Sequence, residues 1–144
     1  MQFSNHEKEI WEKMFTKAKE ALQNAYAPYS NFRVGAAIAA SDGEIFGGCN
    51  VENASYRLTQ CAEGAALTAL VASGRRHIAA VLVMVPKEYN MAASPCGACR
   101  QMLREFATLD TKIYMCDDEK LLETKTLGEL LPMSFGPEHL EGKK

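Results

Sequence analysis

Three cysteines and one glutamate have the types and spacing that a catalytic metal site requires. Cys96 and Cys99 form a Cys-x-x-Cys pair, and Cys61 lies far upstream with Glu63 two residues after it. Three thiolates can hold a zinc ion tetrahedrally and leave the fourth position for water, whereas structural zinc sites close all four positions with protein ligands. If Cys61 and Glu63 open a helix, the carboxylate can reach that water and move protons without binding the metal. The spacing therefore predicts a zinc site that performs acid–base chemistry.

Each of these residues also has a plainer interpretation. Cys96 and Cys99 could be a redox pair or part of a structural zinc site. A redox pair would leave Cys61 and Glu63 without a role, and a structural site lacks an evident fourth ligand. A carboxylate at a helix start can simply satisfy the helix dipole. The presence of all four residues together favours the catalytic interpretation.

Length and composition predict one globular domain over residues 1–144. The formal net charge of −2 gives no reason to expect binding to a nucleic-acid backbone. The chain shows no signal-peptide core and no apolar run of about 18 residues that could span a membrane. Five cysteines, three of them with metal spacing, indicate a reducing, cytoplasmic setting without a disulfide framework. Cys49 and Cys116 are expected to be small buried apolar residues.

The first half of the chain reads as a helix, a hairpin and a second helix. Apolar residues at three- and four-residue spacing predict an amphipathic helix over 6–24. Alternation predicts strands over 32–40 and 45–49, joined by a turn, and Gly47–Gly48 suggests a bulge or a close backbone approach. The helix predicted over 61–73 is apolar nearly all round, so a second subunit is expected to cover part of it.

The second half adds strands and shorter helices. A continuous apolar strand over 77–85 is typical of one buried on both faces. The remaining expected elements are a helix from Cys96 to about 107, a strand over 112–116, an extended piece over 121–125 and a helix over 127–131. This order predicts an α/β fold with three layers, α/β/α, around a mixed central sheet of about five strands. Both ligand stretches begin helices, where the dipole favours thiolate over thiol.

Ligand-x-Glu followed by Pro-Cys-x-x-Cys is the pattern of zinc nucleobase deaminases. From about residue 26 to 138 the chain resembles the small, homotetrameric, three-cysteine type of cytidine deaminase. The stretches that carry the resemblance, in the family's order, are Tyr26–Ala37, Gly48–Tyr56, Cys61–Glu63, Ser94–Gln101 and Leu130–Phe135. Several independent stretches are more specific than any one motif.

The resemblance implies one Zn²⁺ per subunit and a cytidine deaminase-like fold. The implied reaction is hydrolytic deamination of free cytidine, and of deoxycytidine, to uridine or deoxyuridine and ammonia in pyrimidine salvage. It implies the zinc ligands Cys61, Cys96 and Cys99, with Glu63 as the proton shuttle. It also implies a homotetramer with composite sites, no nucleic acid or membrane partner, and the substrate contacts Phe32, Asn50, Glu52, Ala54, Tyr56, Ala62 and Phe135.

The resemblance assigns these residues to different parts of the substrate and to different subunits. Asn50 and Glu52 are expected at the ribose hydroxyls and Phe32 against the pyrimidine face, while Ala54, Tyr56 and Phe135 are expected to reach a neighbouring subunit's site. From the residues alone, Asn50 and Glu52 read as loop residues and Phe32 as a core residue.

One residue departs from the family pattern. Members commonly have Arg directly after the catalytic Glu, where it donates to ligand thiolates, and this chain has Gly64. Three thiolates around a dication leave a net negative charge, which makes zinc a poorer Lewis acid. We hypothesise that Arg57 or Gln60, just upstream of Cys61, donates to a ligand sulfur instead.

Other functions stay open at this point. The chain could deaminate another aminopyrimidine nucleoside, such as a blasticidin-like antibiotic, or a base in single-stranded nucleic acid. A nucleic-acid editor should have a basic groove lined with aromatic residues, and this acidic chain shows none. A carboxylate at Glu52 suits a hydroxyl and repels a phosphate, which favours a free nucleoside. A catalytically silent zinc-binding or assembly module is the alternative from a different class.

Overall fold

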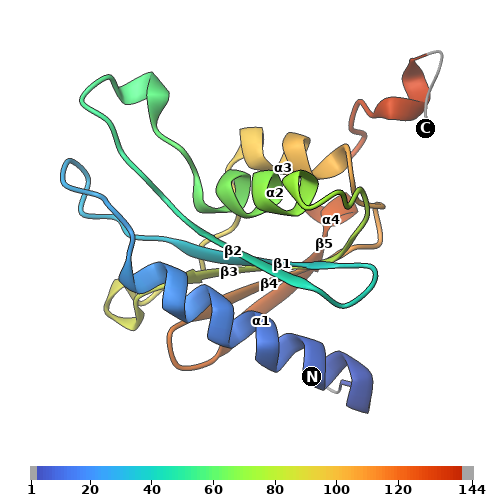
Figure 1. Cartoon of the computed structure of the whole chain (residues 1–144), viewed down its shortest axis with the longest axis horizontal. Coiled ribbons are helices and arrows are strands. Elements are labelled where there is room, and N and C mark those ends of the chain that lie inside the picture. The colour runs from blue at the N-terminus through green and yellow to red at the C-terminus, as the bar shows by residue number, and fades with distance from the viewer. Residues whose placement is uncertain (1–2, 141–144) are drawn as a thin grey trace.

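One mixed sheet of five strands organises the protein, in a computed structural model that describes residues 3–140 (Figure 1). The strands lie in the order β2-β1-β3-β4-β5, with only β3 and β4 parallel. Their bounds are β1 Gly35–Ala40, β2 Ile45–Cys49, β3 Ile78–Val85, β4 Lys112–Asp117 and β5 Leu121–Thr126. The predicted α/β fold with a mixed sheet of about five strands is confirmed. The single domain expected over 1–144 also includes residues 1–2 and 141–144, which lie outside the described part of the chain.

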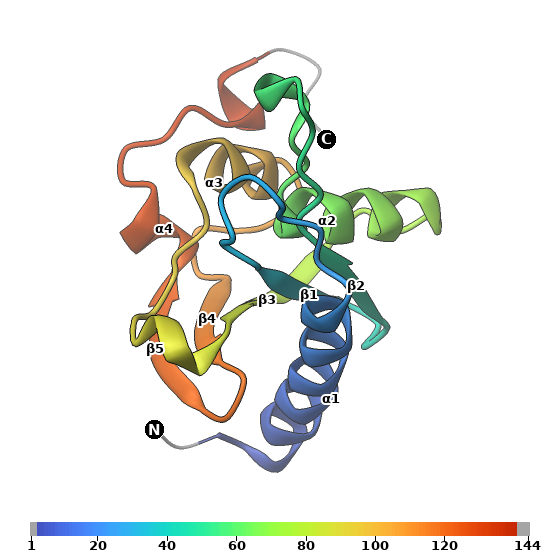
Figure 2. The same cartoon turned by 90° about the vertical axis from the view of Figure 1, so that its left-hand side faces the viewer.

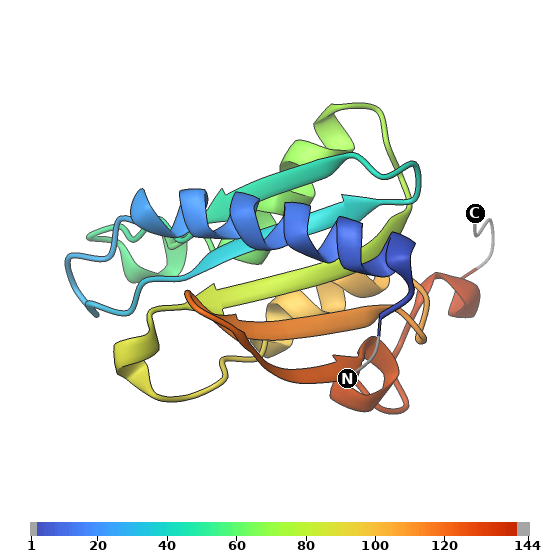
Figure 3. The same cartoon turned by 90° about the horizontal axis from the view of Figure 1, so that it is seen from below.

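Helices cover both faces of the sheet, which gives the three expected layers (Figures 1 and 3). Helix α1 (Asn5–Gln23) packs on one face, and the opposite face carries α2 (Ala62–Ala72), α3 (Gly97–Arg104) and α4 (Leu127–Leu130). Strand β3 alternates between the two cores, because Val81 and Val83 face α2 and α3 while Leu82 and Met84 face α1. Burial on both faces explains why β3 reads as a continuous apolar run.

Strand β1 begins at Gly35, three residues later than the alternation predicts. The Asn50 side chain takes the place of a partner strand there. Its amide donates to the carbonyl of Phe32 at 2.7 Å, and its carbonyl oxygen accepts from the amide of Val34 at 2.9 Å. Asn50 therefore holds Phe32 and Val34 through its side chain, and its backbone amide donates to the Val34 carbonyl at 3.1 Å, where a regular strand ladder would otherwise continue.

Of the two readings for Gly47–Gly48, the close backbone approach is confirmed. The register of β2 against β1 is continuous through both glycines. A Cβ on Gly48 would lie 2.5 Å from the carbonyl oxygen of Ala62 and 2.5 Å from the amide nitrogen of Ala66. The first turn of α2 thus rests directly on the backbone of β2, which fixes where Glu63 stands.

Three loops gather at the end of the sheet where α2 and α3 begin (Figures 1, 2 and 3). They cover residues 24–34, 50–61 and 86–96, and the last two contain the short helices η1 (Tyr56–Leu58) and η2 (Lys87–Tyr89). All the chemistry-bearing positions before residue 100 therefore lie at one end of the molecule. Within residues 3–140, no helix combines the length and apolarity needed to cross a bilayer.

We expect Gly48→Ala to destabilise the fold by about 1–3 kcal/mol, because the added methyl forces α2 away from β2. Gly97→Ala is the matched control, since a Cβ there meets no atom within 4 Å. Urea unfolding of both variants at one fixed chain concentration measures the difference. Equal midpoints for the two variants would contradict the close packing.

Candidate active site

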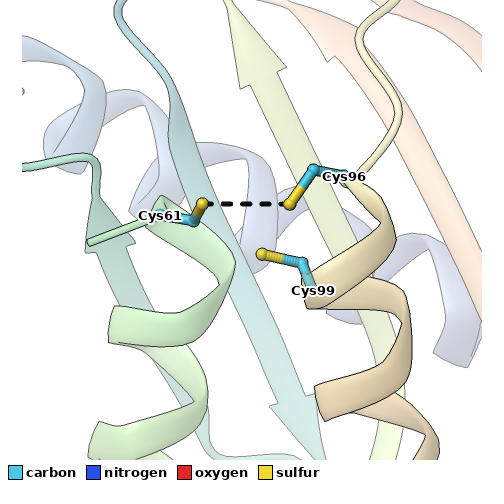
Figure 4. A group of neighbouring side chains, drawn as sticks. All are labelled: Cys61, Cys96 and Cys99. Carbon is cyan, nitrogen blue, oxygen red and sulfur yellow. Dashed lines mark hydrogen bonds between the residues drawn. The ribbon is translucent and has the colours of Figure 1, made fainter. Parts of the chain in front are cut away.

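The Sγ atoms of Cys61, Cys96 and Cys99 converge on one point, as Figure 4 shows. All three lie within 4.8 Å of one another, and those of Cys61 and Cys96 are 4.0 Å apart. With zinc–sulfur bonds of about 2.3 Å, two sulfurs of a tetrahedral site lie about 3.8 Å apart. The cluster is therefore suited to hold a zinc ion. It offers three ligands and no fourth His, Cys, Asp or Glu ligand within the described residues.

Two helix N-termini deliver these sulfurs. Cys61 is the N-cap residue of α2 and Cys96 that of α3, and neither side chain forms a capping hydrogen bond. Cys99 lies in the first turn of α3 and is fully buried. Both helix dipoles thus present their positive ends to the cluster, which favours the thiolate forms that bind metal.

The thiols also act on one another. The pKa of Cys61 is lowered to about 6, chiefly because Cys99 and then Cys96 donate hydrogen bonds to its thiolate. The pKa of Cys99 is raised, because its proton is held by Cys61 and its side chain is buried. These interactions favour the thiolate form of Cys61 and the protonated form of Cys99.

Glu63 stands beside these sulfurs in the first turn of α2, with 5% of its surface exposed. The pKa of its carboxyl is raised to about 7, chiefly by burial and to a smaller extent by the charge on Cys61. Hydrogen bonds from its own backbone amide and from Cys99 act in the opposite direction. A pKa near the working pH is what a group that both accepts and donates protons needs.

The hypothesis that Arg57 or Gln60 donates to a ligand sulfur receives no support from the single chain. Neither side chain forms such a hydrogen bond in the described range. Instead the Gln60 side chain lies over Gly64, where an added Cβ would meet its amide nitrogen at 2.5 Å. The position where the family commonly has Arg is therefore covered by a neutral amide.

The expected ribose and base contacts lie in the loops at the same end. Glu52 accepts hydrogen bonds from the backbone amides of Tyr29 and Ser30 and from the Ser30 hydroxyl. These bonds, above all the one from the hydroxyl, lower the pKa of Glu52. Together with Tyr56 it borders a cavity of about 270 Å³. Asn50 is 8% exposed and holds residues 32–34, while Phe32 keeps 37% of its surface exposed.

The other expected contacts are distributed differently. Ala62 is fully buried behind Cys61. Ala54, Tyr56 and Phe135 are exposed, and the Phe135 ring stacks on His139 at 4.9 Å. The η1 segment and the short helix η3 (Pro137–His139) stand at opposite ends of the long axis (Figures 1 and 3). One chain therefore does not bring Tyr56 and Phe135 together.

Sequence reasoning gave no role to three polar side chains of α3. Arg100 donates to the carbonyl of Pro95 at 2.7 Å, to Ser94 and to Leu130, so it braces the loop that ends at Cys96. Gln101 donates to the carbonyl of Phe135, and Arg104, 8% exposed, pairs with Glu138. The sequence gives little indication of these roles, because the three side chains look like ordinary polar residues of an amphipathic helix.

Comparison with known proteins gives concordant matches. Residues 8–116 match the family model described as the cytidine and deoxycytidylate deaminase zinc-binding region. The chain is 42% identical over 129 residues to cytidine deaminase of Sporosarcina psychrophila, covering 90% of this chain and 93% of that one.

Two solved structures are similar as well. That of cytidine deaminase from Burkholderia pseudomallei superposes with a TM-score of 0.79 at 39% identity, covering 92% of this chain and all of the other. That from Mycobacterium tuberculosis gives 0.75 at 39% identity, covering 88% and 97%.

We expect zinc affinity to fall as the pH falls, because each ligand proton that binding displaces lowers the association constant about tenfold per pH unit. Cys99, with its raised pKa, releases a proton on binding across the neutral range. Cys61 adds a further proton below its pKa of about 6, so the slope steepens there. Titration against a chelator of known protonation constants measures this dependence.

Cys49→Ala serves as the control, because Cys49 lies outside the cluster and should leave the profile unchanged. An affinity independent of pH between about 5 and 8 would contradict binding through these thiols.

Proposed function

This chain belongs to the cytidine and deoxycytidylate deaminase family, and we propose that it hydrolyses free cytidine, and deoxycytidine, to uridine or deoxyuridine and ammonia. The observation that carries the proposal is the pairing of three convergent sulfurs with one buried carboxyl, Glu63, whose pKa is raised to about 7. In pyrimidine salvage, such a reaction converts a cytosine nucleoside to the corresponding uracil nucleoside.

We assign the zinc ion to Cys61, Cys96 and Cys99, one ion per subunit. When bound, zinc supplies the Lewis acidity that makes water a competent nucleophile at neutral pH. The two helix N-termini partly offset the negative charge that three thiolates bring to the site.

Glu63 moves the protons in this proposal. Its carboxylate accepts a proton from the attacking water and delivers it to N3 of the pyrimidine, while the oxygen bonds to C4. The same carboxylate then takes the remaining proton of the hydroxyl at C4 and gives it to the amino group. The C4–N bond breaks, ammonia leaves, and C4 becomes the carbonyl carbon of uridine. Because its pKa lies near neutrality, the carboxyl can act as a base and then as an acid at the working pH.

We propose the substrate contacts that the family resemblance implies. Phe32 would pack against the pyrimidine face, and Asn50 and Glu52 would bind the ribose hydroxyls. Ala62, next to the ligand Cys61 in the sequence, is the contact nearest the metal site. Three hydrogen bonds keep Glu52 ionised, since they lower its pKa. A fixed carboxylate accepts from a hydroxyl and repels a phosphate, which favours the nucleoside over the nucleotide.

We further propose a cytoplasmic homotetramer whose sites are shared between chains. All five cysteines are free, as a reducing compartment requires. Thr68, Ala69 and Ala72 leave one stripe of α2 exposed, and a second copy would cover it. The separation of η1 and η3 fits the idea that Ala54, Tyr56 and Phe135 serve neighbouring subunits (Figures 1 and 3).

Replacing Glu63 with Gln should leave zinc bound and lower kcat about 10²- to 10⁴-fold, because the amide cannot shuttle protons. The change in absorbance when cytidine becomes uridine measures kcat, and metal analysis measures zinc. Glu12→Gln on the exposed side of α1 is the matched control and should keep wild-type kcat. A zinc-loaded Glu63→Gln enzyme at wild-type rate would exclude this role.

The same assay separates the alternative functions. A zinc-loaded wild type that is silent on cytidine and deoxycytidine but releases ammonia from a blasticidin-like nucleoside would be a deaminase of another substrate. Silence on all three would indicate a zinc-binding assembly module. No observation on the site favours either alternative over cytidine.

A further inference from the structure

Phe32, the residue assigned to the pyrimidine face, rests on another aromatic ring of the same chain. The ring of Tyr89 lies parallel to it, with centroids 4.9 Å apart and planes 17° from parallel. Tyr89 is the last residue of η2, 57 positions along the chain. Tyr89 thus covers one face of the Phe32 ring, and 37% of the residue's surface remains exposed to a ligand.

The hydroxyl of Tyr89 also forms hydrogen bonds with the backbone of the residues on both sides of Phe32. It donates to the carbonyl of Asn31 at 2.6 Å and accepts from the amide of Arg33 at 3.0 Å. Asn31 has a left-handed backbone (φ 60°), a conformation that turns the chain sharply just before the ring. One side chain thus holds the turn, the ring and the residue that follows.

Tyr89 can do this because η2 is itself anchored to the sheet. The amide of Lys87 donates to the Asp118 carboxylate at 2.8 Å, and its ammonium pairs with Glu119. Both acidic residues belong to the turn between β4 and β5. The same loop continues to Cys96. One loop therefore holds both the ring that stacks on Phe32 and a proposed metal ligand.

We propose that Tyr89 is a positioning residue for the reaction: it fixes Phe32 as a rigid platform against which the pyrimidine stacks. This inference rests on the proposed function, because it takes the ligand of Phe32 to be a cytosine nucleoside. A preset platform spares the substrate the cost of ordering the loop. Stacking is present before and during the reaction, so its loss raises KM and leaves kcat nearly unchanged.

Tyr89→Phe keeps the stacked ring and removes both hydrogen bonds of the hydroxyl. We expect KM for cytidine to rise about 3- to 10-fold, the usual effect of losing one or two such bonds, with kcat within about twofold of wild type. Tyr89→Leu, which also removes the stack, should raise KM further. Zinc content should stay complete in both variants. Tyr114→Phe is the matched control, because Tyr114 is a buried tyrosine in the core on the α1 face of the sheet.

Amide hydrogen exchange gives a readout that does not depend on activity. In Tyr89→Phe the amide of Arg33 should exchange faster, while that of Val34, which donates to Asn50, should keep its protection. An unchanged KM in Tyr89→Phe and Tyr89→Leu, with active wild type, would overturn this inference alone. A wild type that forms no uridine from cytidine would overturn the proposed function, and the inference with it.

Discussion

The site depends on the placement of two helix N-termini. Helices α2 and α3 start side by side on the same face of the sheet, each with a cysteine as its N-cap residue. A thiolate cluster is unfavourable unless something stabilises its charge, and the N-termini of α2 and α3 both do so. Gly48 fixes α2 against β2, and Arg100 fixes the loop that leads into α3. The sulfurs therefore meet because the contact at Gly48 and the hydrogen bonds of Arg100 place the starts of the two helices.

The sequence predicted the parts of this arrangement that have a period or a motif. Regular spacing predicted the helices and strands in their succession along the chain, and the Cys-x-x-Cys spacing together with Cys61 predicted the cluster. The predictions were wrong where a side chain replaces a regular ladder, as at residues 32–34, which Asn50 holds outside β1. Tyr89 left no signal in the pattern, because its contact with Phe32 joins two irregular loops.

At Gly64 this chain lacks the positive charge that the family pattern commonly has next to the catalytic Glu. The Gln60 side chain lies over Gly64, but its amide is neutral. With zinc bound, the charge of the three thiolates would be opposed by the metal and by the helix dipoles. A less electrophilic metal would make its bound water less acidic, so the reaction would depend more on the general base. The raised pKa of Glu63 makes its carboxylate a stronger base.

The apolar character of α2 links the site to the assembly. A helix without a polar face must be covered all round, yet Thr68 and Ala69 remain exposed in the single chain. The loops at the same end also carry exposed aromatic residues, among them Tyr56 at 75%. In the proposed oligomer, a second copy would cover this exposed surface and also exclude water from the pocket. Oligomer formation and completion of the active site would then be the same physical event.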